Sequence, residues 1–185
     1  ACAPFRRLHL CDRNLEHIEP HQITSTHNLL VDVLLAAKHE GESLVKKYKE
    51  YKEDNPDLRS DICTVLARSF ADIGDIIRGK DLFLGHKQRK KELEERLQKM
   101  FQNITHSNAA KLSELSSEEI REYWWNANRQ QVWNAITCGV TDGDKYFRDT
   151  CSKGGHYKKC HCNDGDVLTN FDYVPQYLRW FEEWA

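Results

Sequence analysis

The sequence lacks the short motifs that mark the common catalytic folds. It contains no phosphate-binding loop, no dinucleotide-binding fingerprint, no nucleophile elbow and no H-E-x-x-H motif. Asp72 and Asp75 lie among arginines, but no nucleophile or second carboxylate pair accompanies them. Helical spacing instead pairs Asp72 with Arg68, and it pairs Asp75 with Arg78 in the same way. We therefore expect no catalytic residue and no enzyme activity.

Long apolar runs and a surplus of one charge are also missing. No stretch approaches the length of a membrane span, and the first residues do not form a secretory signal. The net charge of −2 produces no general attraction for nucleic acid or for a membrane surface. We expect neither as a partner, and we expect no cofactor. Because the chain starts and stops within motifs, at Ala1 and Ala185, we also expect it to be a fragment of a larger protein.

Seven cysteines are many for 185 residues, and because their number is odd at least one has no partner within the chain. They are Cys2, Cys11, Cys63, Cys138, Cys151, Cys160 and Cys162. Two interpretations fit these cysteines: they form disulfides in an oxidising compartment, or those near the end of the chain bind a metal. The candidate zinc ligands are Cys151, His156, Cys160, His161 and Cys162. Their spacing differs from that of common structural zinc sites, so we expect no metal, and a zinc-containing helical interaction module is the alternative function.

Three of the five tryptophans lie within ten residues of the stretch 119–138. Ser116 or Ser117 caps the start of a helix here, and Gly139 ends it. Apolar residues on two faces predict a helix that is packed on more than one side. We expect these tryptophans in the core, with their indole N–H groups hydrogen-bonded, and not exposed for sugar stacking.

Four further stretches have the apolar periodicity of helices: 26–55, 60–78, 85–104 and 172–185. In the second, Gly74 lies in mid-pattern and predicts the close approach of another helix. The first stretch has a seam that predicts lengthwise packing on another helix, formed by Leu30, Leu34, Ala37, Gly41, Leu44, Tyr48 and Tyr51. The last has an aromatic stripe that we expect to be buried, formed by Tyr177, Trp180, Phe181 and Trp184.

The remaining segments have little periodicity. Residues 1–25 predict an extended, disulfide-pinned arm on which Arg6 and Arg7 are solvated, and residues 139–169 predict cysteine-containing loops. Together these patterns predict an all-α, disulfide-stapled domain with loop-rich, cysteine-containing segments. Asn103 begins a glycosylation sequon, which matters only in a secretory pathway that glycosylates.

Basic residues gather in two places and are candidate contacts for a sulfated glycan or another receptor, although a solvated face is the alternative. The candidates are Lys46, Lys47, Lys87, Arg89, Lys90 and Lys91.

Several blocks of the sequence resemble a known family. Three stretches look like the hallmark blocks of Duffy-binding-like domains: ARSFADIGDIIRGKDLF (67–83), REYWWNANRQQVWNAITC (121–138) and DYVPQYLRWFEEWA (172–185). The opening stretch, ACAPFRRLHLCDRNLE (1–16), is similar to the alpha type of these domains. The alpha type is found in the erythrocyte membrane protein 1 family of the malaria parasite. The resemblance runs nearly end to end and in the family's order.

The resemblance implies the mainly helical Duffy-binding-like fold. Residues 1–25 would be the end of subdomain 1, residues 26–138 the helical subdomain 2, and residues 139–185 the start of a truncated subdomain 3. The family's second-subdomain disulfide maps onto Cys63 and Cys138.

The resemblance also implies an adhesin. Such proteins vary antigenically, are displayed on the extracellular face of the infected erythrocyte membrane, and bind receptors of host red cells or endothelium in cytoadhesion or rosetting. A heparan-sulfate-like glycan is one receptor that the alpha type implies. The parent protein would be membrane-anchored, while this chain itself would touch no membrane.

Overall fold

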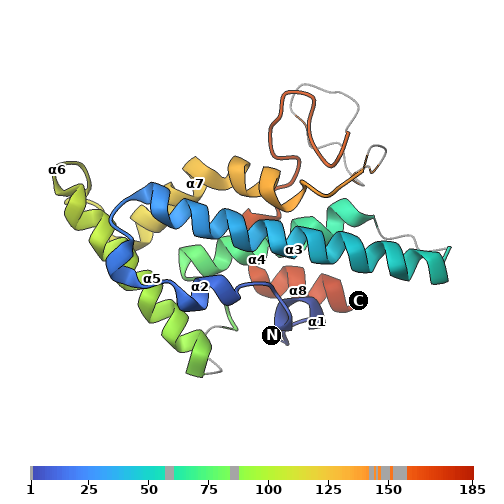
Figure 1. Ribbon diagram of the computed structural model, residues 1–185, viewed down its shortest axis with the longest axis horizontal. Helices are drawn as coiled ribbons and strands as arrows, with labels where there is room; N and C mark the ends of the chain where they lie inside the picture. The colour runs from blue at the N-terminus through green and yellow to red at the C-terminus, as the bar shows by residue number, and fades with distance from the viewer. Residues whose placement is uncertain are drawn as a thin grey trace.

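The fold consists of helices joined by loops, as the periodicity predicts (Figure 1). The computed structural model describes residues 2–56, 61–83, 88–141, 144, 146, 151 and 158–185. The helices are α1 (Phe5–Leu8), α2 (Arg13–His17), η1 (Pro20–Gln22), α3 (Thr26–Asp54), α4 (Ile62–Arg78), α5 (Gln88–Ser107), α6 (Ala109–Leu112), α7 (Ser117–Ile136), η2 (Phe171–Tyr173) and α8 (Gln176–Trp184). Over these described ranges no β-strand is found, which confirms the all-α prediction.

Local signals set the ends of the long helices. The side chain of Ser25 accepts the backbone N–H of Asn28 at the start of α3, and Asp61 does the same for Thr64 at the start of α4. Gly79 ends α4 in the left-handed conformation, with φ of 73°. A reciprocal capping box between Ser116 and Glu119 begins α7. These boundaries lie within a few residues of those that the sequence predicts.

The most enclosed helix is α4, because α1, α3, α7, η2 and α8 all pack against it. Fifteen of its 17 residues are buried, so its charged side chains are enclosed along with its apolar ones. The tryptophan helix α7 packs on α3, α4 and α5, which confirms that it is covered on more than one side. In Figure 1, α5 lies at one end of the molecule, across the direction of α3.

Two glycines allow the central helices to approach closely. A Cβ atom at Gly41 of α3 would lie 1.9 Å from the carbonyl oxygen of Ile136 at the end of α7. A Cβ atom at Gly74 of α4 would lie 2.7 Å from the ring of Trp125. Gly74 therefore marks a close helix contact, as its position within the apolar pattern predicts.

The two ends of the chain lie side by side (Figure 1). The indole N–H of Trp184 donates to the carbonyl of Cys2 at 3.0 Å. The N-terminal arm forms short helices, so the expected extended segment is wrong, and Cys2 and Cys11 are free thiols that are not bonded to each other. Ion pairs attach the arm instead: Arg7 is buried and bonded to Asp81 at 2.8 Å, where solvated side chains were expected.

Candidate functional site

The disulfides differ from the pairing that the family resemblance implies. Cys63 on α4 is bonded to Cys160, with Cα atoms 5.4 Å apart, and Cys151 is bonded to Cys162. Cys138, just after α7, is an exposed free thiol. The expected Cys63–Cys138 bridge is therefore wrong for this structure.

The loop that carries Cys160 is held over the end of α7 by its backbone and by a histidine. The indole N–H of Trp133 donates to the carbonyl of Cys160 at 2.9 Å, and the Thr137 hydroxyl lies 2.8 Å from Nε2 of His161. These contacts bring Cys160 to α4, where Cys63 lies, and leave Cys138 facing solvent. Sequence separation alone gives no signal for such a contact.

The same disulfides exclude the zinc ligands that the sequence suggests. Cys151, Cys160 and Cys162 are all oxidised, so none offers a thiolate to a metal. In the part of the chain that the structure describes, no group of three His, Cys, Asp or Glu residues could hold a metal ion. His156, the other ligand considered, lies outside the described residues.

The acidic residues of α4 form a buried ionic cluster with a structural function. Asp72 accepts hydrogen bonds from Arg6 at 2.7 Å and from Arg179 at 2.8 Å. Asp75 pairs with Arg179 and with Arg78, the latter at 3.0 Å as helical spacing predicts. The other expected pair is wrong: Arg68 bonds Glu182 of α8 at 3.2 Å, because α8 lies alongside this face of α4. Each of these pairs except Asp75–Arg78 joins two elements.

Burial and charge act differently on the two aspartates. Burial opposes the ionisation of Asp72, but Arg6 and Arg179 outweigh it and hold the pKa of Asp72 below its ordinary value. At Asp75 burial outweighs Arg179 and Arg78, and it raises the pKa to about 6. Asp75 is therefore the acidic group of this cluster whose ionisation changes near neutral pH.

The tryptophan helix is anchored through hydrogen bonds as well as packing. The indole N–H of Trp125 donates to Asp172 at 2.9 Å, and Arg129 binds the same carboxylate through two nitrogens. Trp124 packs edge-on against Phe101 of α5, and its indole N–H has no hydrogen-bond partner among the residues that the structure describes. The expectation of a hydrogen-bonded indole is thus confirmed for Trp125 and Trp133 and is wrong for Trp124. All three rings are in the core.

The structure separates the basic candidate residues. Lys46 and Lys47 are exposed on α3, and Lys91 is exposed on α5. Lys90 instead bonds Asp12 and Glu16 of the N-terminal arm, so its ammonium is already neutralised. Lys87 and the side chain of Arg89 lie outside the described residues.

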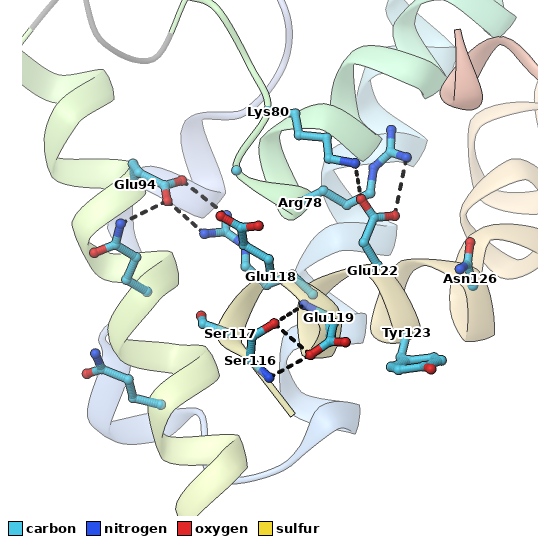
Figure 2. A pocket seen from close by; sticks show the side chains of 14 residues that line it. Arg78, Lys80, Glu94, Ser116, Ser117, Glu118, Glu119, Glu122, Tyr123 and Asn126 are labelled. Atoms are coloured by element: carbon cyan, nitrogen blue, oxygen red, sulfur yellow. Dashed lines mark hydrogen bonds and ion pairs between the residues drawn. The ribbon is translucent and has the colours of Figure 1, made fainter. Parts of the chain in front are cut away.

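A broad cavity of about 1040 Å³ opens between α5, the first turns of α7 and the end of α4 (Figure 2). Its floor is held by Arg121, which donates to the carbonyls of Ile76 and Ile77 and binds Glu94 of α5 at 2.7 Å. On the other side, Glu122 pairs with Lys80 and lies 3.7 Å from Arg78. These pairs connect three helices and give the cavity a fixed shape.

The aromatic stripe of α8 is mostly exposed, which contradicts the expected buried stripe. Only Trp180 is in the core, whereas Tyr177, Phe181 and Trp184 are 54%, 75% and 60% exposed. The buried face of α8 instead presents Arg179 and its polar neighbours to the acids of α4. The stripe and Cys2 line a second cavity of about 540 Å³.

The cavity and most of the ionic cluster are not predictable from local patterns in the sequence. Arg6, Asp81 and Arg179 lie far apart in the sequence, and no local pattern shows that they meet α4 or the arm. One signal was available. The motif blocks contain more charged residues than a buried helix needs, and charged residues in a buried helix indicate ion pairs with other segments. Over the described ranges, no helix has the length and apolar content needed to cross a membrane.

Comparison with known proteins relates the chain to malaria parasite proteins. A family model described as the Duffy binding domain matches residues 1–179. The Duffy receptor beta form of Plasmodium knowlesi is 28% identical over 194 residues, and the Duffy receptor of Plasmodium vivax (strain Salvador I) is 27% identical over 193 residues. Each alignment covers 100% of this chain, but only 14% and 15% of the two receptors.

Solved structures show the same similarity. The NTS-DBL1(alpha-1) domain of the Plasmodium falciparum membrane protein 1 (PfEMP1) from the varO strain has a TM-score of 0.83 at 42% identity, covering 100% of this chain and 43% of that one. An ICAM-1-binding DBLbeta domain of PfEMP1 has a TM-score of 0.73 at 34% identity, covering 97% and 41%. The chain thus spans less than half of each solved domain.

Proposed function

The chain belongs to the Duffy binding domain family, and from this membership we propose that it takes part in binding a receptor on the surface of a host cell. The observation that carries the proposal is the end-to-end structural match, at 42% identity, to a DBL1(alpha-1) domain of PfEMP1. Relatives are consistent with it: two are Duffy receptors, and a similar DBLbeta domain binds ICAM-1.

The alpha-type similarity supports a more specific version. In this version the chain is part of an antigenically variable adhesin on the extracellular face of the infected erythrocyte, and it acts in cytoadhesion or rosetting. Its residues 1–25, 26–138 and 139–185 are parts of three successive subdomains. We propose that it has no catalytic role; the ion pairs that the acids of α4 form with Arg6 and Arg179 support this proposal.

The exposed lysines support a heparan-sulfate-like glycan as one receptor. Lys46 and Lys47 lie on the second half of α3, and Lys91 lies on α5, where each ammonium can reach a sulfate. Lys90 is removed from this set because Asp12 and Glu16 neutralise it.

A cell-binding measurement tests the proposal. The oxidised chain is labelled and added to human red cells and endothelial cells, with and without heparin, and bound label is measured by flow cytometry. We expect saturable binding, and at least a fivefold loss for the triple variant Lys46→Glu, Lys47→Glu, Lys91→Glu. The matched control reverses three exposed lysines elsewhere, with Lys99→Glu, Lys111→Glu and Lys158→Glu.

Each result decides one part of the proposal. Absence of binding to either cell type would overturn receptor binding by this chain. Binding that ignores heparin, salt and the triple variant would overturn the glycan receptor and leave a protein receptor.

A further inference from the structure

The cavity between α5 and α7 continues into another concave region. This second region, of about 400 Å³, lies between the end of α4 and the segment that leads into α8. Arg78, Lys80 and Glu122 line both regions, so the two form one surface, which we call the α7 groove. The shared wall is held in place because Glu122 pairs with Lys80 and lies 3.7 Å from Arg78, which also donates to the carbonyl of Asp172.

One end of the α7 groove has apolar walls. Exposed apolar and aromatic side chains line it, namely Leu82, Tyr173, Val174, Pro175 and Tyr177. The hydroxyl of Tyr173 donates to the side chain of Asn126 at 2.7 Å, and its ring centroid lies 5.0 Å from the guanidinium carbon of Arg129. These two contacts fix the ring, so the concavity exists before a ligand arrives. A preformed pocket with apolar walls suits one large apolar side chain of a partner.

The other end of the α7 groove is acidic. Glu94 and Glu122 are each paired with a cation that lines the groove. Glu118 and Glu119 are exposed there, and for neither is an ion pair found among the residues that the structure describes. Glu119 accepts hydrogen bonds from Ser116, whereas the Glu118 carboxylate is open to a partner. A cationic side chain would therefore be attracted to this end, and an anionic one would be repelled.

The distance between the two ends follows from the geometry of α7. Glu118, Glu122 and Asn126 follow one another at intervals of four residues along one face of the helix (Figure 2). At about 1.5 Å per residue, the backbone positions of Glu118 and Asn126 are about 12 Å apart. Tyr173 is bonded to Asn126, so the apolar end begins where this row of residues ends.

We propose that the α7 groove docks a segment of a partner protein that carries a large apolar side chain and, about 12 Å away, a lysine or arginine. The apolar side chain fills the pocket between Leu82 and Tyr177, and the cation pairs with Glu118. This separation corresponds to about four residues of an extended segment or about eight residues of a helix. Exposed tyrosines around a pocket are typical of the residues that dominate protein interfaces. The inference rests on the proposed function, and it adds a protein-docking surface distinct from the exposed lysines.

The test selects peptides from a phage-displayed library of random dodecapeptides against the oxidised 185-residue chain. The enriched peptides are synthesised and titrated by isothermal calorimetry. We expect them to share an apolar residue and a lysine or arginine at one of the two predicted separations. We also expect at least a tenfold weaker affinity in Glu118→Lys and in Tyr173→Ala. The matched controls, Glu53→Lys and Tyr51→Ala, change an exposed acid and an exposed ring on α3 and are expected to bind within twofold of the wild type.

A charge exchange makes the test specific for the Glu118 contact. A peptide in which the basic residue is replaced by glutamate should bind the wild type at least tenfold more weakly and regain affinity for Glu118→Lys. All four substituted positions are exposed, and thermal unfolding by circular dichroism confirms that each variant is folded.

Three outcomes would overturn the inference: enrichment of acidic peptides, equal affinity in both groove variants, and peptide binding that is lost in Phe181→Ala alone. The last would place the partner on the exposed stripe of α8 instead. Failure here is separable from failure of the proposed function. If the chain binds cells but the groove binds no peptide, receptor binding stands and the groove inference falls. If peptides bind the groove but no cell binds the chain, the groove stands and the receptor function falls.

Discussion

The guanidinium of Arg6 lies 2.7 Å from the carboxylate of Asp72, and this contact joins the N-terminal arm to α4 across 66 residues of sequence. Arg6 also bonds Glu183 of α8, so one side chain connects the arm, the central helix and the last helix. Burial lowers the pKa of Arg6, but Asp72 and Glu183 outweigh it and raise the pKa above its ordinary value. Arg6 is therefore charged at every physiological pH, and its removal leaves a buried carboxylate short of a partner.

We expect Arg6→Ala to lower the unfolding free energy by about 3–5 kcal/mol, the usual cost of removing one partner of a buried ion pair. Urea unfolding followed by circular dichroism measures this loss. The control is Arg13→Ala on the exposed face of α2, which we expect to change stability by less than about 0.5 kcal/mol. Equal effects of the two variants would contradict a structural function for Arg6.

Gly41→Ala should strongly destabilise the chain, by about 3 kcal/mol or more, because the new Cβ atom would lie 1.9 Å from a backbone carbonyl that cannot move without shifting α7. The matched control is Gly139→Ala, whose Cβ atom would meet no atom of the described residues within 4 Å. Thermal unfolding compares the two. A Gly41→Ala variant as stable as Gly139→Ala would show that α3 and α7 are farther apart.

Peptide mapping without reduction should recover Cys63 linked to Cys160, and Cys151 linked to Cys162. Mass spectrometry of natively expressed protein makes this measurement. We expect Cys138→Ser to change stability by less than about 0.5 kcal/mol, whereas loss of the Cys63–Cys160 bond should cost about 2–5 kcal/mol. A peptide that links Cys63 to Cys138 would contradict the structure and restore the pairing that the resemblance implies.

Asp75 makes stability depend on pH in a defined direction. Its pKa is about 6 in the folded chain and about 3.9 in an unfolded one, so between these values the folded state binds the extra proton. The contribution of Asp75 to the unfolding free energy therefore rises as the pH falls from 7 to 4. The slope is at most about 1.4 kcal/mol per pH unit.

Urea unfolding at pH 4.5, 6.0 and 7.5 tests this direction by comparing the wild type with Asp75→Asn. We expect the stability of the wild type relative to the variant to increase toward pH 4.5. Subtracting the variant removes the contributions of the histidines, which the two proteins share. A difference that is independent of pH would show that Asp75 keeps an ordinary pKa.

Lys90→Glu should lower stability by about 1–3 kcal/mol, because it places a third carboxylate next to Asp12 and Glu16. Lys91→Glu, one residue along α5 and exposed, is the control and should leave stability within about 0.5 kcal/mol of the wild type. Differential scanning calorimetry measures both. If the two variants are equally stable, Lys90 is a surface residue and returns to the set of candidate receptor contacts.

Patterns within single segments predicted the helices well. The cap at Ser116 and the stop at Gly79 depend only on neighbouring residues, so they can be read directly from the chain. Gly74 predicted a close helix contact. Glycine inside a helix lowers its stability, so its presence within an apolar helical pattern indicates that a neighbouring element needs the space of a side chain. The pairing of Asp75 with Arg78 follows from the same helical spacing.

Sequence patterns predicted less well which faces and side chains are buried by other segments. The stripe on α8 shows which aromatic residues share a face, but this face is exposed, and the side that packs carries Arg179. Arg6 and Arg7 looked solvated because their acidic partners are distant in sequence. The choice of Cys160 over Cys138 as the partner of Cys63 depends on where the loop after α7 folds back.

The sequence by itself determined the helical class, the helix ends, the absence of the common catalytic motifs and the resemblance to the Duffy-binding-like family. These properties depend on spacing along the chain, and spacing is visible in one dimension. Only the tertiary structure decided which charges are buried together, which lysines remain exposed and where a cavity opens between α5 and α7. Burial and pairing depend on distances between segments that are remote in sequence, because desolvation and Coulomb attraction act through space.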